Sequence, residues 1–391
     1  AEPGPWLNRP MRARLGLPAP EERIGAAAHD FAALLCADEV VLSRAAKVDG
    51  TPTVPSRWLL RLAALRGDTE VAKQETPWLR WAARRNAITN AAPPLQAPAP
   101  RPPVALRPRK LSVTSAEKWF ANPYALYAQR ILRLDPLPDV GLEPGGSLRG
   151  EIIHDALGKF ARAYPQALPD DIAATLMGFA EEALRELTGS PRVAAFWAPR
   201  FERFAQWFAE TEPERRKGVS LQLAEISGAH VITAGGEPFT LTARADRIDI
   251  RDGKGKFSVT LTDYKSAAGI KDLAARAAKG LAPQLPLEAA IALAGGFAGV
   301  GSPARKPSVD GLRYISASGG EPPGLEVSLK VEDIPAFAGE MLAGLEGMVA
   351  AFSNEATPYT AVRRPRYVYD YDDYAHLARI AEWSSDSVEE G

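Results

Sequence analysis

The chain has 391 residues, of which 46% are apolar and 24% are charged, a composition typical of a globular protein with two or three domains. Its one cysteine, Cys36, excludes an internal disulfide and any zinc or iron–sulfur centre held by several cysteines. We find neither a run of about eighteen apolar residues nor a secretory signal, so we expect a cytoplasmic protein with no membrane contact. The chain begins at Ala1 without a Met, and we expect it to be a fragment of a longer protein.

The net charge of −1 does not decide whether the protein binds nucleic acid, because the charges are unevenly distributed. Residues 1–110 contain 17 Lys and Arg against 10 Asp and Glu, which leaves the remainder acidic. An acidic remainder is compatible with a domain that carries clustered metal-binding carboxylates.

Residues 1–90 show mainly helical spacing, over 24–35, 56–65 and 78–88, with a strand and turn predicted at 42–50. Cys36 follows an apolar run, and we expect it in a core. Seven prolines at residues 93–108 block both helix and ladder hydrogen bonding, so 91–110 is predicted to be an extended linker or a surface strap. The predicted division is therefore 1–90, 91–110 and 111–391.

Beyond the linker, apolar periodicity predicts helices over 115–132, 147–164, 170–187 and 193–217. Alternating and β-branched segments then predict strands over 219–227, 240–250 and 256–264. A helix at 282–294, strands at 311–316 and 325–331, and a helix at 334–352 complete the pattern. The fold class is thus α/β, with a mixed sheet flanked by helices.

Chemistry is indicated most sharply by Asp263 and Lys265, which lie two residues apart at the end of a predicted strand and so share one face. Asp246 ends a similar run on the preceding strand, and a hairpin through 252–255 would bring the two carboxylates together. Paired carboxylates repel each other, and a hard divalent cation relieves that repulsion.

An Asp-x-Lys pair alone is more often a solvated ion pair than a catalytic site. Three further residues strengthen the catalytic interpretation. His154 lies on a predicted helix four residues after Gly150, Glu225 lies on the first strand of the sheet, and Gln284 opens the helix after the catalytic strand.

The order of these motifs resembles the RecB-family nuclease module of the PD-(D/E)xK superfamily. The motifs are Gly150-x-x-x-His154, Asp246-Arg247-Ile248-Asp249, Asp263-Tyr264-Lys265-Ser266 and Gln284 on a helix. Segments 111–124, 282–289 and 374–379 also resemble the AddB family of helicase–nuclease subunits, in its alphaproteobacterial branch. Residues 49–58 resemble the end of that family's helicase-like part.

The resemblance implies a restriction-endonuclease-like fold preceded by a mainly helical, helicase-like remnant. It also implies Mg²⁺ or Mn²⁺ held by His154, Asp246, Asp263 and the Tyr264 carbonyl. The catalytic residues would be Asp246, Asp263 and Lys265, with Gln284 supporting the site. Glu225 is left open between an outer-shell acid and a solvent-facing strand residue. Asp249 is expected to be structural, because three residues along a strand place it on the face opposite Asp246.

The sequence departs from that family at three positions. Relatives that hold an iron–sulfur cluster have their first cysteine where Asn122 stands here, and no cysteine follows Cys36, so we expect no cluster. Ala243 replaces a glycine, and Glu288 stands where relatives often have an aromatic residue. None of these changes removes an expected metal ligand.

By the same resemblance the function would be a nuclease, an exonuclease on single-stranded DNA, in a complex that processes double-strand breaks for recombinational repair. Its partner would be an AddA-like motor, since this chain has no Walker A loop and we expect no ATP site in it. Trp119, Arg130, Arg133 and Arg149 are weak candidates for DNA contacts. The alternatives are a catalytically silent DNA-binding or scaffolding module for a motor, and a stand-alone exonuclease.

Overall fold

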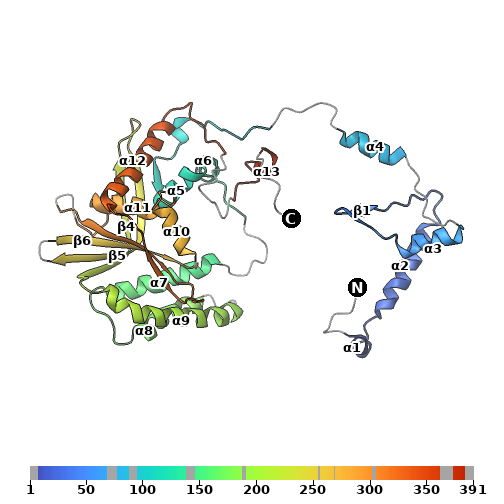
Figure 1. The fold of residues 1–391 in the computed structure, drawn as a ribbon, viewed down its shortest axis with the longest axis horizontal. Coiled ribbons are helices and arrows are strands. Elements are labelled where there is room, and N and C mark those ends of the chain that lie inside the picture. Colours follow the sequence, from blue (N-terminus) through green and yellow to red (C-terminus); the bar gives the residue numbers. More distant parts are fainter. Residues whose placement is uncertain are drawn as a thin grey trace. The chain divides into compact units, whose positions relative to one another are not determined.

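The chain divides after Ala92 into two units, Ala1–Ala92 and Pro93–Gly391, in a computed structural model of the protein (Figure 1). The structure describes residues 8–67, 77–87, 95–137, 146–186, 191–253, 256–267, 269–301, 305–361 and 373–383.

Helices dominate the first unit, as its periodicity predicts. They are α1 (Arg9–Arg14), α2 (Pro20–Leu34), α3 (Arg57–Leu65) and α4 (Pro77–Asn86). The strand predicted at 42–50 is wrong over 42–46: β1 (Lys47–Val48) pairs only with β2 (Thr51–Pro52). The turn between them, at Asp49 and Gly50, has positive φ at both residues, as two-residue hairpins require. Pro52 has no N–H to extend the ladder.

None of the described side chains of the first unit is buried. Cys36 is exposed, so the prediction that it belongs to a core is wrong. The helix predicted from apolar periodicity does end just before Cys36. Other described residues cover α2 only in part, for example where Phe31 stacks on Trp58.

The proline-rich segment is a strap on the second unit over residues 98–107. The N–H groups of Tyr359 and Ala361 each donate to carbonyls of this segment over 2.8 Å. The buried guanidinium of Arg107 donates to the carbonyls of Phe352, Asn354 and Glu355, each over 2.9 Å. These are carbonyls at and beyond the C-terminus of a helix, which a cation there satisfies.

A six-stranded mixed sheet forms the centre of the second unit. Its strands are β3 (Lys110–Ser112), β4 (Leu221–Ile232), β5 (Phe239–Gly253), β6 (Lys256–Lys265), β7 (Ser308–Ser316) and β8 (Leu325–Ser328). The order is β3-β5-β6-β7-β8, with β4 also paired to β5; β3/β5 and β6/β7 are parallel and the other pairs antiparallel. β4 follows nearly the whole length of β5, so β3 and β6 share the other edge of β5, at Thr240–Thr242 and Arg247–Gly253 respectively. One edge of β5 therefore changes partner along its length, from β3 to β6, and we call this change of partner the fork of β5.

Helices cover both faces of the sheet (Figure 1). One face carries α7 (Gly146–Ala163), α8 (Ile172–Glu186) and α9 (Pro191–Arg215), whose core includes Phe160, Phe204 and Tyr264. The other carries α5 (Val113–Ala121), α10 (Ile270–Ala277), α11 (Gln284–Leu293) and α12 (Ile334–Phe352) over the larger core. The predicted fold class is confirmed, and the helices and strands predicted over 147–352 occur with ends shifted by a few residues.

Three features of this unit were not predicted. The helix expected over 115–132 is interrupted: α5 ends at Ala121, α6 covers Pro123–Leu126, and a π-helical turn covers Tyr127–Ile131. Pro123 cannot continue α5, and the Asn122 side chain caps α6 by accepting from the N–H of Ala125 over 3.2 Å. The other two features are the short elements α10 and β3, which have too few residues to show a clear hydrophobic period.

Among the described helices, α12 is long and apolar enough to cross a membrane by length and composition, although no run of that kind was expected. Ala338, Leu345 and Val349 of α12 are buried, and the helix packs on α11 and β7. Core helices pass the same test, so this one helix is weak support for a membrane span.

A cluster of buried charges joins α9 to the sheet. Arg247, 1% exposed, contacts Glu212 over 2.9 Å and Asp249 over 2.8 Å. Asp249 is fully buried, also pairs with Arg313, and accepts from Gln222 over 3.1 Å. These contacts agree with the structural role expected for Asp249.

We expect Asp249→Ala to lower the free energy of unfolding by about 3–5 kcal/mol, because it removes the buried carboxylate that Arg247 and Arg313 share and leaves each with one acidic partner. Urea unfolding followed by circular dichroism measures this. The matched control is Asp252→Ala, since Asp252 pairs with Arg305 where both side chains are largely exposed, and its loss should cost at most about 1 kcal/mol. Equal losses in the two variants would show that the buried cluster is not a stabilising feature.

Candidate active site

The fork in β5 brings the predicted acids together. The β5–β6 ladder ends at the pair Arg247–Thr262, and in the same register the next residues, Asp246 and Asp263, stand opposite each other. The Tyr264 N–H donates over 2.8 Å to the Asp246 carboxylate, not to a backbone carbonyl. The hairpin between the two strands, expected from the sequence, is what creates this juxtaposition.

His154, Glu225 and Asp246 form a group of potential metal ligands. One donor atom from each lies within 4.8 Å of the others, and His154 Nδ1 lies 3.4 Å from Asp246 Oδ1. Glu225 lies opposite Asp246 in the β4–β5 register, and its φ of 57° interrupts the alternation of that strand. Of the two alternatives for Glu225, this geometry favours the acid at the site.

The electrostatics of this group are those of crowded carboxylates. Burial raises the pKa of Glu225, and the charge of Asp246 raises it further. Burial lowers the pKa of His154, but its hydrogen bond with Asp246 and the charges of the nearby carboxylates outweigh burial, so the net shift is upward. The charge of Asp246 contributes to both upward shifts.

Asp263, Lys265 and Gln284 form the adjoining half of the site. Lys265 Nζ lies 2.9 Å from Asp263 Oδ2, and Gln284 Nε2 donates to Asp263 Oδ1 over 2.8 Å. Asp263 is only 3% exposed, and burial raises its pKa. Burial lowers the pKa of Lys265, but the charge of Asp263 and the hydrogen bond to it dominate and raise it.

Two further acids belong to this half and were not singled out as site residues from the sequence. Glu288, 2% exposed, accepts from Gln284 Nε2 over 3.3 Å, and Glu117 accepts from the Gln284 N–H over 3.3 Å. Burial raises the pKa of both, that of Glu288 strongly. A signal for Glu288 did exist, because it is a charged residue four positions after Gln284 in an otherwise apolar helix. Nothing in the local sequence marks Glu117.

The donor set fits a hard divalent cation. It consists of carboxylate oxygens with one imidazole. Mg²⁺ prefers oxygen ligands, and Mn²⁺ also accepts imidazole. The carboxylates of Glu225 and Asp246 crowd each other, and a bound cation would offset their mutual repulsion.

The weak candidates for DNA contacts do not gather at this site. Trp119 is 2% exposed and packs on Phe239 and Phe352, so its ring has no open face for a base, contrary to expectation. Trp119 belongs to the apolar face of α5, and that face packs into the core. Arg130 donates to Ser115 Oγ over 2.8 Å, and Arg133 lies just beyond the π-helical turn with a positive φ.

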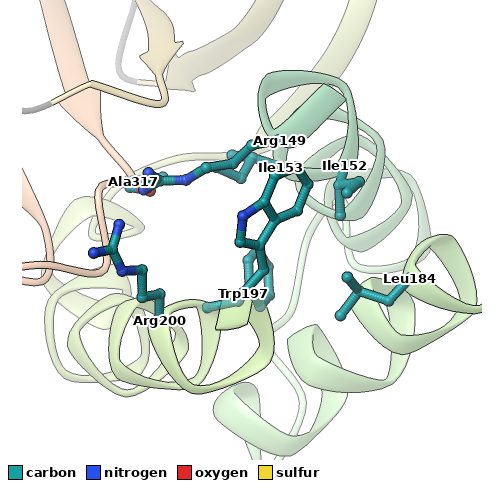
Figure 2. A pocket seen from close by; sticks show the side chains of 8 residues that line it. Arg149, Ile152, Ile153, Leu184, Trp197, Arg200 and Ala317 are labelled. Atoms are coloured by element: carbon teal, nitrogen blue, oxygen red, sulfur yellow. The ribbon is translucent and has the colours of Figure 1, made fainter. Parts of the chain in front are cut away.

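Arg149 lies on α7 beside a narrow pocket against α8 and α9 (Figure 2). Its guanidinium donates to the carbonyl of Ala317 over 3.1 Å and to that of Ser318, directly after β7. Burial and the nearby Arg200 lower its pKa. These contacts hold the segment that follows β7 next to the end of β6, where the Ala317 N–H donates to the Lys265 carbonyl over 2.8 Å.

Comparison with known proteins places this geometry in a family. A model of the PD-(D/E)XK nuclease superfamily matches residues 110–363, which contain every residue of the site. The chain belongs to the PD-(D/E)XK nuclease superfamily. Nucleases of this superfamily use divalent metal ions, in agreement with the donor set described above.

Several longer proteins are similar to this chain. An uncharacterized protein of Rickettsia bellii is 26% identical over 289 residues, covering 69% of this chain and 32% of that protein. A second, from Rickettsia conorii, is 24% identical over 410 residues, covering 97% and 46%. An ATP-dependent helicase/deoxyribonuclease subunit of Lachnoclostridium phytofermentans is 27% identical over 184 residues, covering 41% and 15%. The chain spans less than half the length of each of these relatives.

A crystal structure of the protein SSO0001 aligns with 62% of this chain and 77% of its own, at 11% identity and a TM-score of 0.26. That similarity is too low to support a conclusion about fold or function.

We expect Glu288→Gln to change how stability depends on pH. Because the pKa of Glu288 is raised on folding, the folded protein holds a proton that the unfolded chain loses just above pH 4.5. The folded state binds more protons there, so wild-type stability falls as pH rises from that point, and Glu288→Gln removes this component. Denaturant unfolding between pH 4 and pH 8 measures it. Exposed Glu340→Gln on α12 is the control, and identical pH profiles for the two variants would contradict the expectation.

Proposed function

We propose that this chain is a metal-dependent deoxyribonuclease that hydrolyses phosphodiester bonds with Mg²⁺ or Mn²⁺. The observation that carries the proposal is the pairing of Asp263 and Lys265 beside the His154, Glu225 and Asp246 group, in a domain of a nuclease superfamily. His154, Asp246, Asp263 and the Tyr264 carbonyl would hold the cation, with Glu225 beside them.

Each side chain then has a distinct task. A bound divalent cation supplies Lewis acidity and a nucleophilic water for in-line attack on phosphorus. Lys265, whose raised pKa keeps it protonated near neutral pH, supplies positive charge and N–H donors to the phosphate and does not accept a proton. Gln284 orients the Asp263 carboxylate through its 2.8 Å hydrogen bond.

We further propose that the substrate is single-stranded DNA, cut as an exonuclease, within a helicase–nuclease complex of the cytoplasm that processes double-strand breaks for recombinational repair. The partner would be an AddA-like motor. In support, the matching Lachnoclostridium protein is named as a helicase/deoxyribonuclease subunit, and the motifs resemble the AddB family. The relatives are more than twice as long as the part this chain matches, so motor-related regions would lie elsewhere in such proteins.

Cleavage of end-labelled single-stranded DNA with Mg²⁺ or Mn²⁺ tests the activity. We expect Asp263→Ala and Lys265→Ala each to lower the rate by at least about 10²–10³-fold, because the first removes a proposed ligand of the cation and the second removes positive charge at the reacting phosphate. Asp155→Asn is the control, since this carboxylate neighbours His154 in sequence but pairs with Lys159.

DNA binding without cleavage by the wild type would instead favour the catalytically silent DNA-binding module. A large loss of thermal stability in Lys265→Ala would favour a structural ion pair.

Metal binding can be measured without activity. We expect Mn²⁺ at about 100 times its Kd to stabilise the wild type by about 2.7 kcal/mol, which is the binding free energy added to the folded state. His154→Ala and Asp246→Asn should lose most of this stabilisation, and Asp155→Asn should retain it. The readout is the thermal midpoint with Mn²⁺ and with chelator. A stabilisation that survives both ligand variants would place the cation elsewhere.

A further inference from the structure

A groove of about 780 Å³ opens along the half of β5 that lies between β3 and β4. Its size is within the range of ligand-binding sites. Its floor and walls come from β3, β4 and β5 and from the turn at 295–301. The lining residues with polar side chains are Lys110, Ser112, Ser227, Thr242 and Arg244.

The chemistry of the groove suits an anionic polymer. Lys110 and Arg244 are exposed, and the described residues that line it include no carboxylate. Lysine, arginine and hydroxyl side chains are the usual contacts to phosphate and sugar. The described lining therefore carries two basic side chains and no acidic one, in a unit whose overall charge is negative.

One wall of the groove is built from backbone. The turn at 295–301 is joined to the edge of β4 by the hydrogen bond from the Ala229 N–H to the Gly296 carbonyl, 3.0 Å long. A Cβ on Gly296 would lie 2.3 Å from the Ala229 carbonyl oxygen, and one on Gly228 would lie 2.4 Å from the Phe297 ring. Glycine at these two positions keeps the turn close to β4 and fixes the shape of the wall.

The groove leads to the metal ligands. Arg244 Nε lies 2.5 Å from Glu225 Oε2, and Glu225 is one of the three grouped donors. The Arg244 side chain is nevertheless 68% exposed, so it faces both the groove and the site. On α7, a Cβ at Gly158 would lie 3.2 Å from Glu225 Cγ and 3.3 Å from an Arg162 nitrogen, which puts a second exposed cation near the same carboxylate.

We propose that one DNA strand lies along this groove on its way to the metal site, with Lys110 and Arg244 contacting its phosphates. This inference rests on the proposed nuclease function and adds the substrate path to it. The ring in the lining, Phe297, is 2% exposed, so the described groove offers phosphate contacts and no base stacking. Binding here is therefore independent of base sequence.

Arg244 also links the two sites. Without a cation nearby, Glu225 holds the Arg244 guanidinium by a short ion pair. A cation bound beside Glu225 would weaken that attraction, because its positive charge would offset the charge of the carboxylate. Arg244 then turns to phosphate, so its contribution to DNA affinity is greater when metal is present.

Fluorescence anisotropy of the full chain with a labelled single-stranded oligonucleotide tests this path, in chelator and again in Ca²⁺. We expect Lys110→Ala to raise the Kd several-fold in both conditions and to reduce the salt slope by about 0.7, the value for one phosphate contact on a single strand. Arg244→Ala should weaken binding more in Ca²⁺ than in chelator, and Arg244→Lys should restore part of the affinity. Lys330→Ala is the charge-matched control, because Lys330 is exposed just after β8 at the opposite edge of the sheet.

Equal affinities for the wild type, Lys110→Ala and Lys330→Ala would overturn the proposed path even if cleavage is intact. A strong preference for one oligonucleotide sequence would also overturn it. Conversely, the expected affinity losses in a wild type that binds but does not cleave DNA would support the path while removing the nuclease function. The Mn²⁺ stabilisation of Lys110→Ala, unchanged from the wild type, checks that this variant is folded with its metal ligands in place.

Discussion

The geometry of the candidate site depends on the contacts of one buried group, the guanidinium of Arg247. It contacts Glu212 of α9, Asp249 of β5 and, over 3.3 Å, the hydroxyl of Tyr264 on β6. One side chain thus joins a covering helix and two strands directly beside the proposed catalytic residues. Arg247 follows Asp246 in sequence, and the Tyr264 N–H donates to that carboxylate. The position of the first acid is therefore fixed by a charge cluster that water does not reach.

The fork of β5 then explains why the candidate site lies at this point of the sheet. Where β6 leaves β5 the ladder stops, and backbone groups that would have paired with each other are available to side chains. Asp246 takes the Tyr264 N–H, and Asp263 turns toward Lys265 and Gln284. On the same edge of β5, β3 takes over the pairing at Thr240–Thr242, and the groove proposed as the DNA path lies along this half of the strand. This one irregularity in strand pairing therefore shapes both the group of potential metal ligands and the groove.

Two further acidic groups lie beside Gln284. Glu288 is buried and Glu117 is half-buried, and loss of solvation raises the pKa of each. Such groups are costly in an isolated domain, and they are usually retained where a cation or a substrate uses the field that they create. Asn122, in contrast, has a local structural role. Its side chain caps α6 by accepting a hydrogen bond from the Ala125 N–H.

The sequence by itself determined the fold class, the helices and strands of 147–352, and the pairing of Asp263 with Lys265, because these follow from periodicity and from residues close together along one strand. It also indicated that Asp249 is structural, through strand alternation. Only the tertiary structure decided the place of Glu225, since its direction depends on a positive φ that no composition reveals. Tertiary packing likewise buried Trp119 and left Cys36 exposed, because periodicity shows that a helix has an apolar face and not whether another element covers it. The association of Glu117 with Gln284 joins residues 167 positions apart, a contact that only the folded chain creates.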